Sequence, residues 1–122
     1  MVSRTEDLVA RLRDLAAGAA DIEAAAVVSV DGMLIASALP RGVEPDRISA
    51  MSAAMLSLSE RMSVELGRGA LDGVFIRGEH GYVLLQSIGG SAVLTALAGK
   101  DARLGRALLD MRRAAADLHG LL

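Results

Sequence analysis

The sequence predicts an α+β domain in which a five-stranded, mostly antiparallel sheet carries helices on both faces. Three observations support this prediction. Helical periodicity occurs at both ends of the chain and once in the middle, and short apolar runs bounded by glycine-containing turns lie between these helices. The 122 residues are enough for one hydrophobic core, so we expect a single domain over residues 1–122. The predicted order of elements is α-ββ-α-βββ-α.

The first helix is predicted from a capping box at the N-terminus, Ser3-Arg4-Thr5-Glu6. In this motif the Ser hydroxyl and the Glu carboxylate each accept a hydrogen bond from a free backbone N–H. Leu8, Leu12 and Leu15 then form one apolar stripe, and Gly18 is expected to end the helix.

A β-hairpin is expected next. The apolar runs Ala25 to Val30 and Met33 to Ser37 are predicted strands, and Asp31-Gly32 lies between them. Asp-Gly accepts positive φ angles, which a two-residue hairpin turn requires.

The central helix is expected to begin at Pro45 and to end at Gly67. It contains twelve consecutive uncharged residues, Ile48 to Ser59. At about 100° per residue, one apolar stripe emerges, and we expect it to pack on the sheet. Its members are Ile48, Met51, Met55, Leu58, Met62 and Leu66. The methionines in it would also suit an adaptable binding groove, although core packing is the favoured interpretation.

The opposite side of this helix is small and neutral, where a monomer of this size would show Lys and Glu. We interpret it as an association helix, covered once by its own sheet and once by a partner. The alternative is a central helix that is buried entirely within one chain. Four residues form a strip between the two sides: Ser52, Leu56, Ser59 and Ser63.

Three more strands are predicted, Leu71 to Arg77, Tyr82 to Ile88 and Ser91 to Ala98. Every strand connection except the one through the central helix is a tight hairpin, so the sheet should be mostly antiparallel. Asp101 is a predicted N-cap for the last helix. The apolar stripe of this helix contains Leu104, Leu108, Met111, Ala115 and Leu118.

Composition excludes several classes of function. The chain has no Cys, which excludes disulfides and thiolate zinc sites. A net charge of −2 with interleaved signs gives no basic surface for nucleic acid. Residues 1–13 are charged and amphipathic, unlike a signal peptide, so we expect a cytoplasmic protein. Residues 81–99 are uncharged, but Gln86, Ser87 and two glycines indicate two strands and a turn, and no membrane span is expected.

Catalytic motifs are missing from the sequence. Gly99-Lys100 resembles the end of a phosphate-binding loop, but Leu94 stands where that motif needs Gly and Asp101 where it needs Ser or Thr. His80 and His119 lack metal-ligand spacing, and Glu79-His80 fits a solvated turn. We therefore expect no enzyme activity, no cofactor and no metal.

Several local strings together resemble the roadblock/dynein light chain family, whose bacterial and archaeal members, the MglB type, work with small Ras-like GTPases. The resemblance covers nearly the whole chain. It is carried by the first hairpin from Ala26 to Ala36, the small, neutral central helix, the segments Tyr82 to Leu85 and Ala92 to Leu94, and the final run from Leu104 to Arg113. Each string is weak alone, but all of them occur in the order and spacing of the family.

The resemblance implies a roadblock-type, profilin-like domain without catalytic residues. It also implies a homodimer in which the central helices pack antiparallel and the third strands pair edge to edge. We place the expected dimer interface at Ala50, Ala53, Ala54, Ser57, Gly73, Val74, Phe75 and Ile76. We place the expected binding surface for a partner at Ser52, Leu56, Ser59, Glu60, Arg61 and Ser63.

The expected function is that of a non-enzymatic homodimeric regulator or adaptor that binds a Ras-like small GTPase. Arg41, Arg61 and Arg68 are the nearest candidates for an arginine finger, and each equally fits an ordinary surface position. Two other functions are weighed: a small-molecule sensor module, and a structural scaffold subunit of a signalling or motility complex. The sensor is less favoured because the sequence shows no aromatic or charged lining for a ligand cavity.

Overall fold

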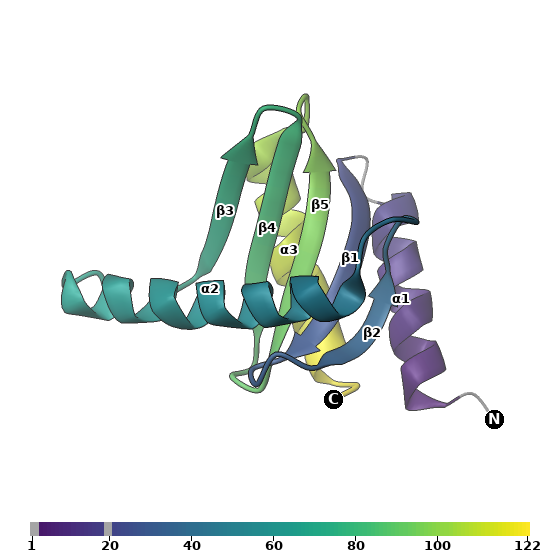
Figure 1. The fold of residues 1–122 in the computed structure, drawn as a ribbon, viewed down its shortest axis with the longest axis horizontal. Helices are drawn as coiled ribbons and strands as arrows, with labels where there is room; N and C mark the ends of the chain where they lie inside the picture. Colours follow the sequence, from purple (N-terminus) through teal and green to yellow (C-terminus); the bar gives the residue numbers. More distant parts are fainter. Residues whose placement is uncertain (1–2, 19–20) are drawn as a thin grey trace.

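The computed structural model describes residues 3–18 and 21–122, and it confirms the predicted order α-ββ-α-βββ-α (Figure 1). The elements are α1 (Arg4–Gly18), β1 (Ile22–Ser29), β2 (Leu34–Ala38), α2 (Pro45–Glu65), β3 (Gly73–Gly78), β4 (Gly81–Ile88), β5 (Ala92–Gly99) and α3 (Leu104–His119). Most boundaries lie within two residues of the predicted ones. The largest difference is at β1, which begins at Ile22 where Ala25 was expected.

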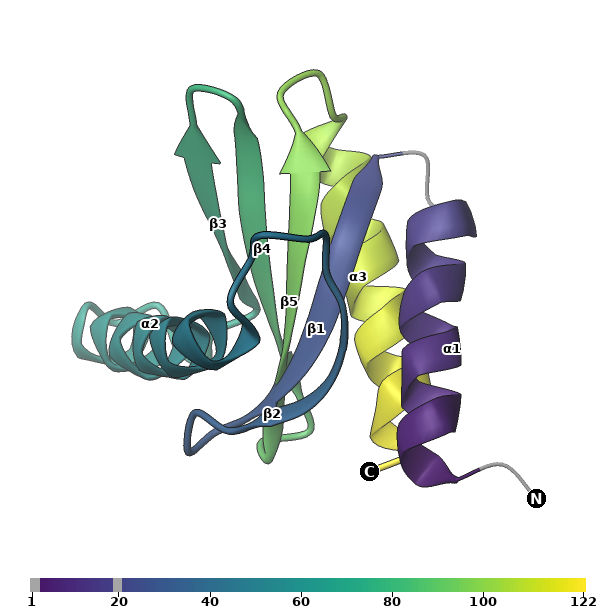
Figure 2. The ribbon, with the colours of Figure 1, turned by 45° about the vertical axis from the view of Figure 1, so that its right-hand side comes forward.

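The five strands form one antiparallel sheet in the order β2-β1-β5-β4-β3. The sheet separates two layers of helix (Figure 2). α1 and α3 lie side by side on one face, whereas α2 crosses the strands on the other face. β3, the last strand in this order, is an edge strand, and it lies close to α2.

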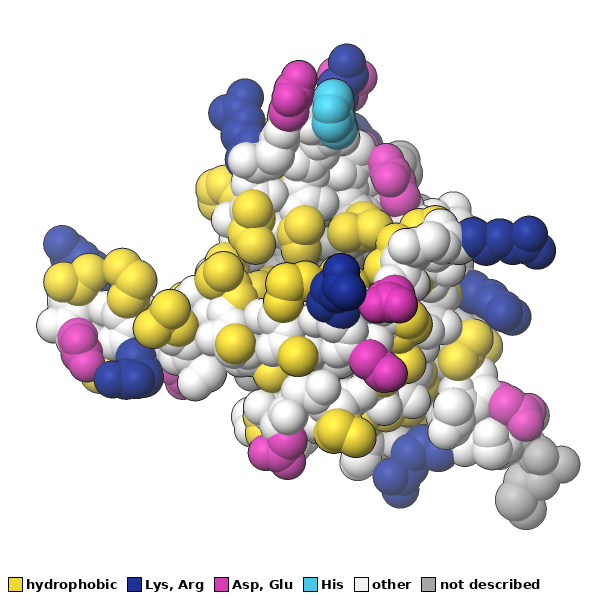
Figure 3. Space-filling view, viewed as in Figure 1, with side chains coloured by type: hydrophobic (Ala, Val, Ile, Leu, Met, Phe, Trp, Pro, Cys, Tyr) yellow, Lys and Arg dark blue, Asp and Glu magenta, His cyan; other side chains and the backbone are white. Residues whose placement is uncertain are grey.

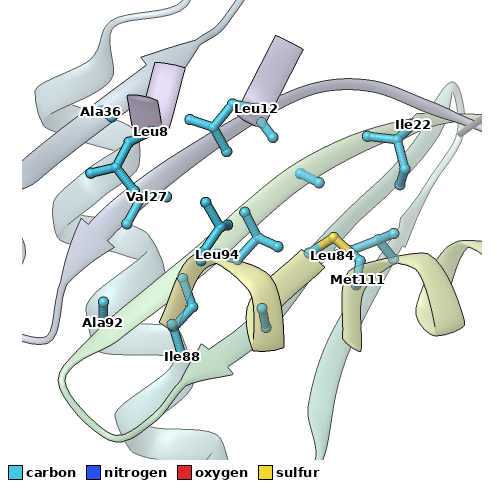
Figure 4. Close-up of a cluster of buried hydrophobic side chains, with 14 of the residues drawn as sticks. Leu8, Leu12, Ile22, Val27, Ala36, Leu84, Ile88, Ala92, Leu94 and Met111 are labelled. Carbon is cyan, nitrogen blue, oxygen red and sulfur yellow. The ribbon is translucent and has the colours of Figure 1, made fainter. Parts of the chain in front are cut away.

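The main hydrophobic core lies between the sheet and the pair α1 and α3. Figure 4 shows Leu8 and Leu12 of α1 close to Val27 of β1, and Met111 of α3 close to Leu84 of β4. All five of these side chains are fully buried. Most of the buried aliphatic side chains thus lie on the face of the sheet that α1 and α3 cover.

The predicted cap of α1 is confirmed. The backbone N–H of Glu6 donates to Ser3 Oγ at 3.1 Å, which caps α1. The predicted two-residue turn at Asp31-Gly32 is wrong, because β1 ends at Ser29, β2 begins at Leu34, and of this dipeptide only Gly32 has a positive φ. Gly32 has a φ of 87° in the β1–β2 turn. A Cβ on Gly32 would lie 3.4 Å from Ala50 Cα, so this hairpin approaches the backbone of α2 closely. Glycine at this position is therefore favoured by the positive φ of the turn, since a Cβ there would make only an ordinary van der Waals contact with α2.

The predicted N-cap of the last helix is wrong. α3 begins at Leu104, and Arg103 occupies the N-cap position without a capping side-chain hydrogen bond. Asp101 lies in a turn instead, because the N–H of Ala102 donates to the carbonyl of Gly99 at 3.0 Å. This turn separates β5 from α3 and uses the residues that were expected to start the helix.

The only two aromatic side chains of the protein contact each other beside the edge strand. Phe75 of β3 and Tyr82 of β4 meet edge to face, with ring centroids 6.4 Å apart and an interplanar angle of 67°. Tyr82 also packs against the core beneath α1 and α3. The pair thereby ties β3 to the rest of the sheet.

Candidate functional site: the outward face of α2 and the free edge of β3

α2 packs on the sheet through its small and polar face. Ser49, Ser52, Ala53 and Leu56 are its buried residues. Thr95 Oγ1 of β5 donates a hydrogen bond to Ser52 Oγ at 2.8 Å, and this pair is buried. Ser49 Oγ donates to the carbonyl of Pro45 at 2.6 Å. Because these hydroxyls are hydrogen-bonded, the helix can bury serines without an unpaired polar group.

This arrangement corrects the predicted orientation of α2. Of the stripe that was expected to face the core, Ile48 is only partly buried and the rest are exposed, so that expectation is wrong; the exposed members are Met51, Met55, Leu58, Met62 and Leu66. Small side chains at Ser49, Ser52 and Ala53 let α2 approach the sheet, and Leu56 then fills the space beside Leu85 and Val93. Large methionines on that side would hold the helix farther from Thr95 and leave its hydroxyl without Ser52.

The apolar stripe of α2 consequently points away from the sheet. Four large side chains on it are exposed: Met51 by 54%, Met55 by 40%, Leu58 by 57% and Met62 by 57%. At about 100° per residue, the centre of this stripe lies roughly 140° around the helix from the centre of the buried face. An ordered row of large apolar side chains in water is typical of an interaction surface. We call these four residues the outward stripe.

A second apolar surface lies on the sheet next to α2. Ile76 of β3 is paired with Val83 of β4, and Val83 is paired with Leu97 of β5, so the three side chains form one row across the sheet. Ile76 is 41% exposed, and the other two are partly exposed. Figure 3 shows hydrophobic side chains both along α2 and on the sheet above it. The outward stripe and this sheet row therefore lie on one side of the molecule.

The edge strand β3 borders this apolar surface. Its sequence, Gly73 to Gly78, contains no Pro and no Lys, and Arg77 is its only charged residue. β3 pairs with β4 along one side, and along the other side its backbone has no neighbouring strand within the sheet. An unprotected edge of this kind is a ready position for another strand.

α2 extends beyond the sheet at the β3 edge. Its C-terminal part projects beyond β3 (Figure 1), and Met62, Val64 and Leu66 on this projection are exposed. The chain then folds back, because Ser63 Oγ donates to the carbonyl of Gly69 at 2.7 Å. Asp72 at the start of β3 is held from the opposite face by Arg112 of α3 at 3.2 Å. The segment before β3 thus has a polar contact with α3 as well as the contact with α2.

The predicted interface residues are only partly brought together. On the predicted dimer face, Ala50, Ala54, Ser57, Phe75 and Ile76 are exposed. Ala53, a residue of α2, is buried against the sheet, and Gly73 and Val74 are partly buried. The methionine stripe was considered as a binding groove but assigned to the core, and Val83 and Leu97 were not predicted as part of a surface. One signal was present, because Thr95 is a hydroxyl between buried apolar residues of β5 and needed a partner from the covering helix.

The predicted partner-binding surface lies mostly against the sheet. Ser52 and Leu56, the latter 5% exposed, are buried against the sheet, so they cannot form a docking surface on this fold. Ser59 and Ser63 are partly buried. Glu60 and Arg61, the other two residues of the expected partner-binding surface, are exposed, and a partner can reach them.

Two grooves among the described residues do not resemble a small-molecule site. One, of about 440 Å³, lies between α1 and α3 and has a charged rim, in which Arg11 and Asp117 form an ion pair at 3.4 Å. Another, of about 530 Å³, lies around Asp21, His80 and Lys100. Both are open and charged, whereas ligand pockets are mostly apolar and enclosed. Within residues 3–18 and 21–122, no group of three or more acidic or His side chains is arranged to hold a metal ion.

No helix in the described part of the chain is long and apolar enough to cross a membrane. The uncharged stretch over 81–99 instead forms β4, its turn and β5. The prediction of two strands in this stretch is thereby confirmed.

Comparison with known proteins supports both the sequence resemblance and the fold. The family model for the Roadblock/LC7 domain matches residues 8–98. The uncharacterized protein MJ0310 of Methanocaldococcus jannaschii is 37% identical over 94 residues, which cover 77% of this chain and 82% of that protein.

Several solved structures share the fold at low sequence identity. An MglB with a tetrameric arrangement superposes with a TM-score of 0.87 at 19% identity, covering 99% of this chain and 91% of that one. Myxococcus xanthus MglB has a TM-score of 0.84 at 18% identity, covering 93% of both chains. Acanthamoeba castellanii profilin IB has a TM-score of 0.69 at 15% identity, covering 93% of this chain and 97% of the profilin. The architecture is therefore profilin-like.

Proposed function

This chain belongs to the Roadblock/LC7 domain family, and from that premise we propose that it is a non-enzymatic homodimer that regulates or adapts a Ras-like small GTPase. The observation that carries the proposal is the outward stripe of α2 beside the free edge of β3. A monomer would leave both in water. A second copy of the chain offers a matching surface for each of them.

The proposed dimer pairs β3 with β3 of the second copy, which makes one continuous sheet. The projection of α2 beyond β3 then extends over the sheet of the partner (Figure 1). There it covers the row of Ile76, Val83 and Leu97, and the two outward stripes come together over the seam. Two-fold symmetry makes every contact occur twice, so each apolar surface exposed in one chain is covered by the other.

The partner class in the proposal comes from the resemblance to MglB-type members of the family, and the structural similarity to MglB agrees with it. We place the GTPase on the α2 side of the dimer, with Arg61 at the contact. Arg61 is exposed near the projecting end of α2 and, at about 100° per residue, lies on the side of the helix that does not face the sheet. The failed phosphate-loop match at Gly99-Lys100 supports a role in which the GTPase, and not this chain, binds the nucleotide.

The dimer is tested by light scattering coupled to gel filtration at micromolar concentration. The wild type should have twice the mass of the chain. Leu58→Asp places a charge in the outward stripe and should give a folded monomer. The matched control is Leu109→Asp, because Leu109 is an exposed leucine on α3, on the opposite face of the sheet, and this variant should remain a dimer. A monomeric wild type, or dimeric Leu58→Asp, would contradict the proposed interface.

The partner is tested by co-elution with a small GTPase from the same cell, loaded with GTP or with GDP. We expect co-elution that depends on the nucleotide. Arg61→Glu should reduce binding at least tenfold while the dimer is retained. Arg13→Glu, an exposed arginine on α1, is the control and should bind normally. Equal binding by both variants would move the docking site away from α2, and no co-elution in either nucleotide state would reject the GTPase.

A further inference from the structure

The methionines of this protein are unevenly placed. In the described part of the chain they are Met33, Met51, Met55, Met62 and Met111. Three of them, Met51, Met55 and Met62, belong to the outward stripe. Met33 is exposed in the β1–β2 turn, and Met111 is fully buried in the core. The sequence contains no Cys, so no thiol competes for an oxidant.

We infer that Met51, Met55 and Met62 form an oxidation-sensitive site, and that their conversion to sulfoxides separates the dimer. The inference rests on the proposed homodimer and adds a means of regulating it. The oxidant is hydrogen peroxide. Its oxygen atom is transferred to the thioether sulfur as the O–O bond breaks, and the other oxygen leaves as water. The sulfur loses two electrons, and the peroxide gains them.

The physical effect follows from the position of the sulfurs. A thioether is apolar and deformable, which suits a packed interface, whereas a sulfoxide is polar and chiral. In the proposed dimer the oxidised side chains would be buried without hydrogen-bond partners. Two-fold symmetry would place six sulfoxides at one seam. The core would be unaffected, because Met111 is shielded from the oxidant by the fold.

Accessibility also couples oxidation to assembly. In the free chain these three methionines are 40–57% exposed, whereas the proposed dimer covers them. Their oxidation should therefore slow as the protein concentration rises through the range of dimerisation. Oxidation of Met33 should not depend on concentration, because the β1–β2 turn lies outside the proposed interface. This residue is an internal control within the same molecule.

The experiment compares the full-length wild type with Met51→Leu/Met55→Leu/Met62→Leu, which retains an apolar stripe without sulfur. Both proteins are first shown to be dimers without peroxide. They are then treated with hydrogen peroxide, mapped by mass spectrometry of peptides, and examined by sedimentation equilibrium and circular dichroism. We expect the dissociation constant of the wild type to rise at least tenfold with unchanged helical content. The triple variant should remain a dimer, and methionine sulfoxide reductases A and B should restore the wild type.

The outcomes separate the two proposals. A monomeric wild type before treatment would reject the homodimer and, with it, this site. A wild type that stays dimeric with sulfoxides at all three positions would overturn the site alone. Equal dissociation of the triple variant would also overturn it, since Met33 or another residue would then be responsible. Should the triple variant fail to fold, Met33→Leu decides the question: peroxide should still dissociate this variant, and a Met33→Leu protein that stays dimeric would overturn the site.

Discussion

A single pair of hydroxyls decides which side of α2 meets the sheet. Ser52 and Thr95 are both buried, and a rotated helix would leave the buried Thr95 hydroxyl without its partner. An unpaired buried hydroxyl costs more than a missing methyl contact, because the lost hydrogen bonds to water are not replaced. The polar pair therefore has more influence on the rotation of α2 than its apolar stripe has.

We predict that Thr95→Val lowers the free energy of unfolding by about 1–3 kcal/mol, because Ser52 Oγ then lacks its donor. The double variant Ser52→Ala/Thr95→Val should recover a substantial part of this loss. Urea denaturation at a fixed protein concentration measures both values. Ser57→Ala, an exposed serine on the same helix, is the control and should stay near the wild type. An additive double variant would show that the hydrogen bond does not couple the two residues.

At the scale of single residues, the sequence could predict turns and caps better than contacts between distant elements. Ser3 and Gly32 act through their own backbone neighbourhood, so local rules were sufficient for the cap and for the position of the turn, although not for its two-residue length. The N-cap prediction at Asp101 was wrong because a turn at Gly99 comes between β5 and the start of α3. The Ser52–Thr95 bond joins residues 43 positions apart; the apolar surroundings of Thr95 in β5 indicate that it needs a partner, but no local pattern identifies that partner as Ser52.

The elements themselves were all predicted in the correct order, but the rotation of α2 was not. Its length follows from Pro45 and from the glycine at 67, which has a φ of 73°. Its orientation does not follow from hydrophobicity, which assigns the methionines to the core. A helix that is apolar on the outside is found where a second protein surface covers it. The apolar outward side of α2 therefore explains both why the orientation of the helix was predicted wrongly and why this side is the candidate site.

Leu56→Asp and Leu58→Asp separate the two faces of α2 in one comparison. Leu56 lies against Leu85 and Val93, so a charge there should lower the free energy of unfolding by about 3 kcal/mol or more. Leu58 is exposed in the single chain, so Leu58→Asp should retain a cooperative unfolding transition as a monomer. Thermal and urea unfolding by circular dichroism test this. A Leu56→Asp protein as stable as the wild type would mean that α2 packs on its other side.

On the scale of the whole molecule, the two faces of the sheet have different tasks. The α1 and α3 face holds the main core and makes the protomer stable. The α2 face has a smaller cluster around Leu56, Leu85 and Val93 and leaves much apolar surface uncovered. The fold thus places its larger core on one side of the sheet and leaves apolar surface on the other side available for association.

The purified chain alone should not hydrolyse GTP, because the Gly99-Lys100 segment forms the end of β5 and a turn and has no phosphate-binding loop. Release of phosphate should stay at the level of a buffer blank after repeated purification. The melting temperature should not change with a chelator, since the described residues offer no metal cluster. Turnover that follows the protein through purification, or melting that depends on the chelator, would contradict this expectation.

The contact between Phe75 and Tyr82 has a practical consequence in spectroscopy. The chain has one tyrosine and no tryptophan, so nearly all of its intrinsic ultraviolet emission comes from a single phenol ring. That ring touches the edge strand through Phe75. A change in the pairing of β3 should therefore alter the intensity and anisotropy of one identified fluorophore. Dilution of the unlabelled protein can then be followed optically, with the signal arising from the strand edge itself.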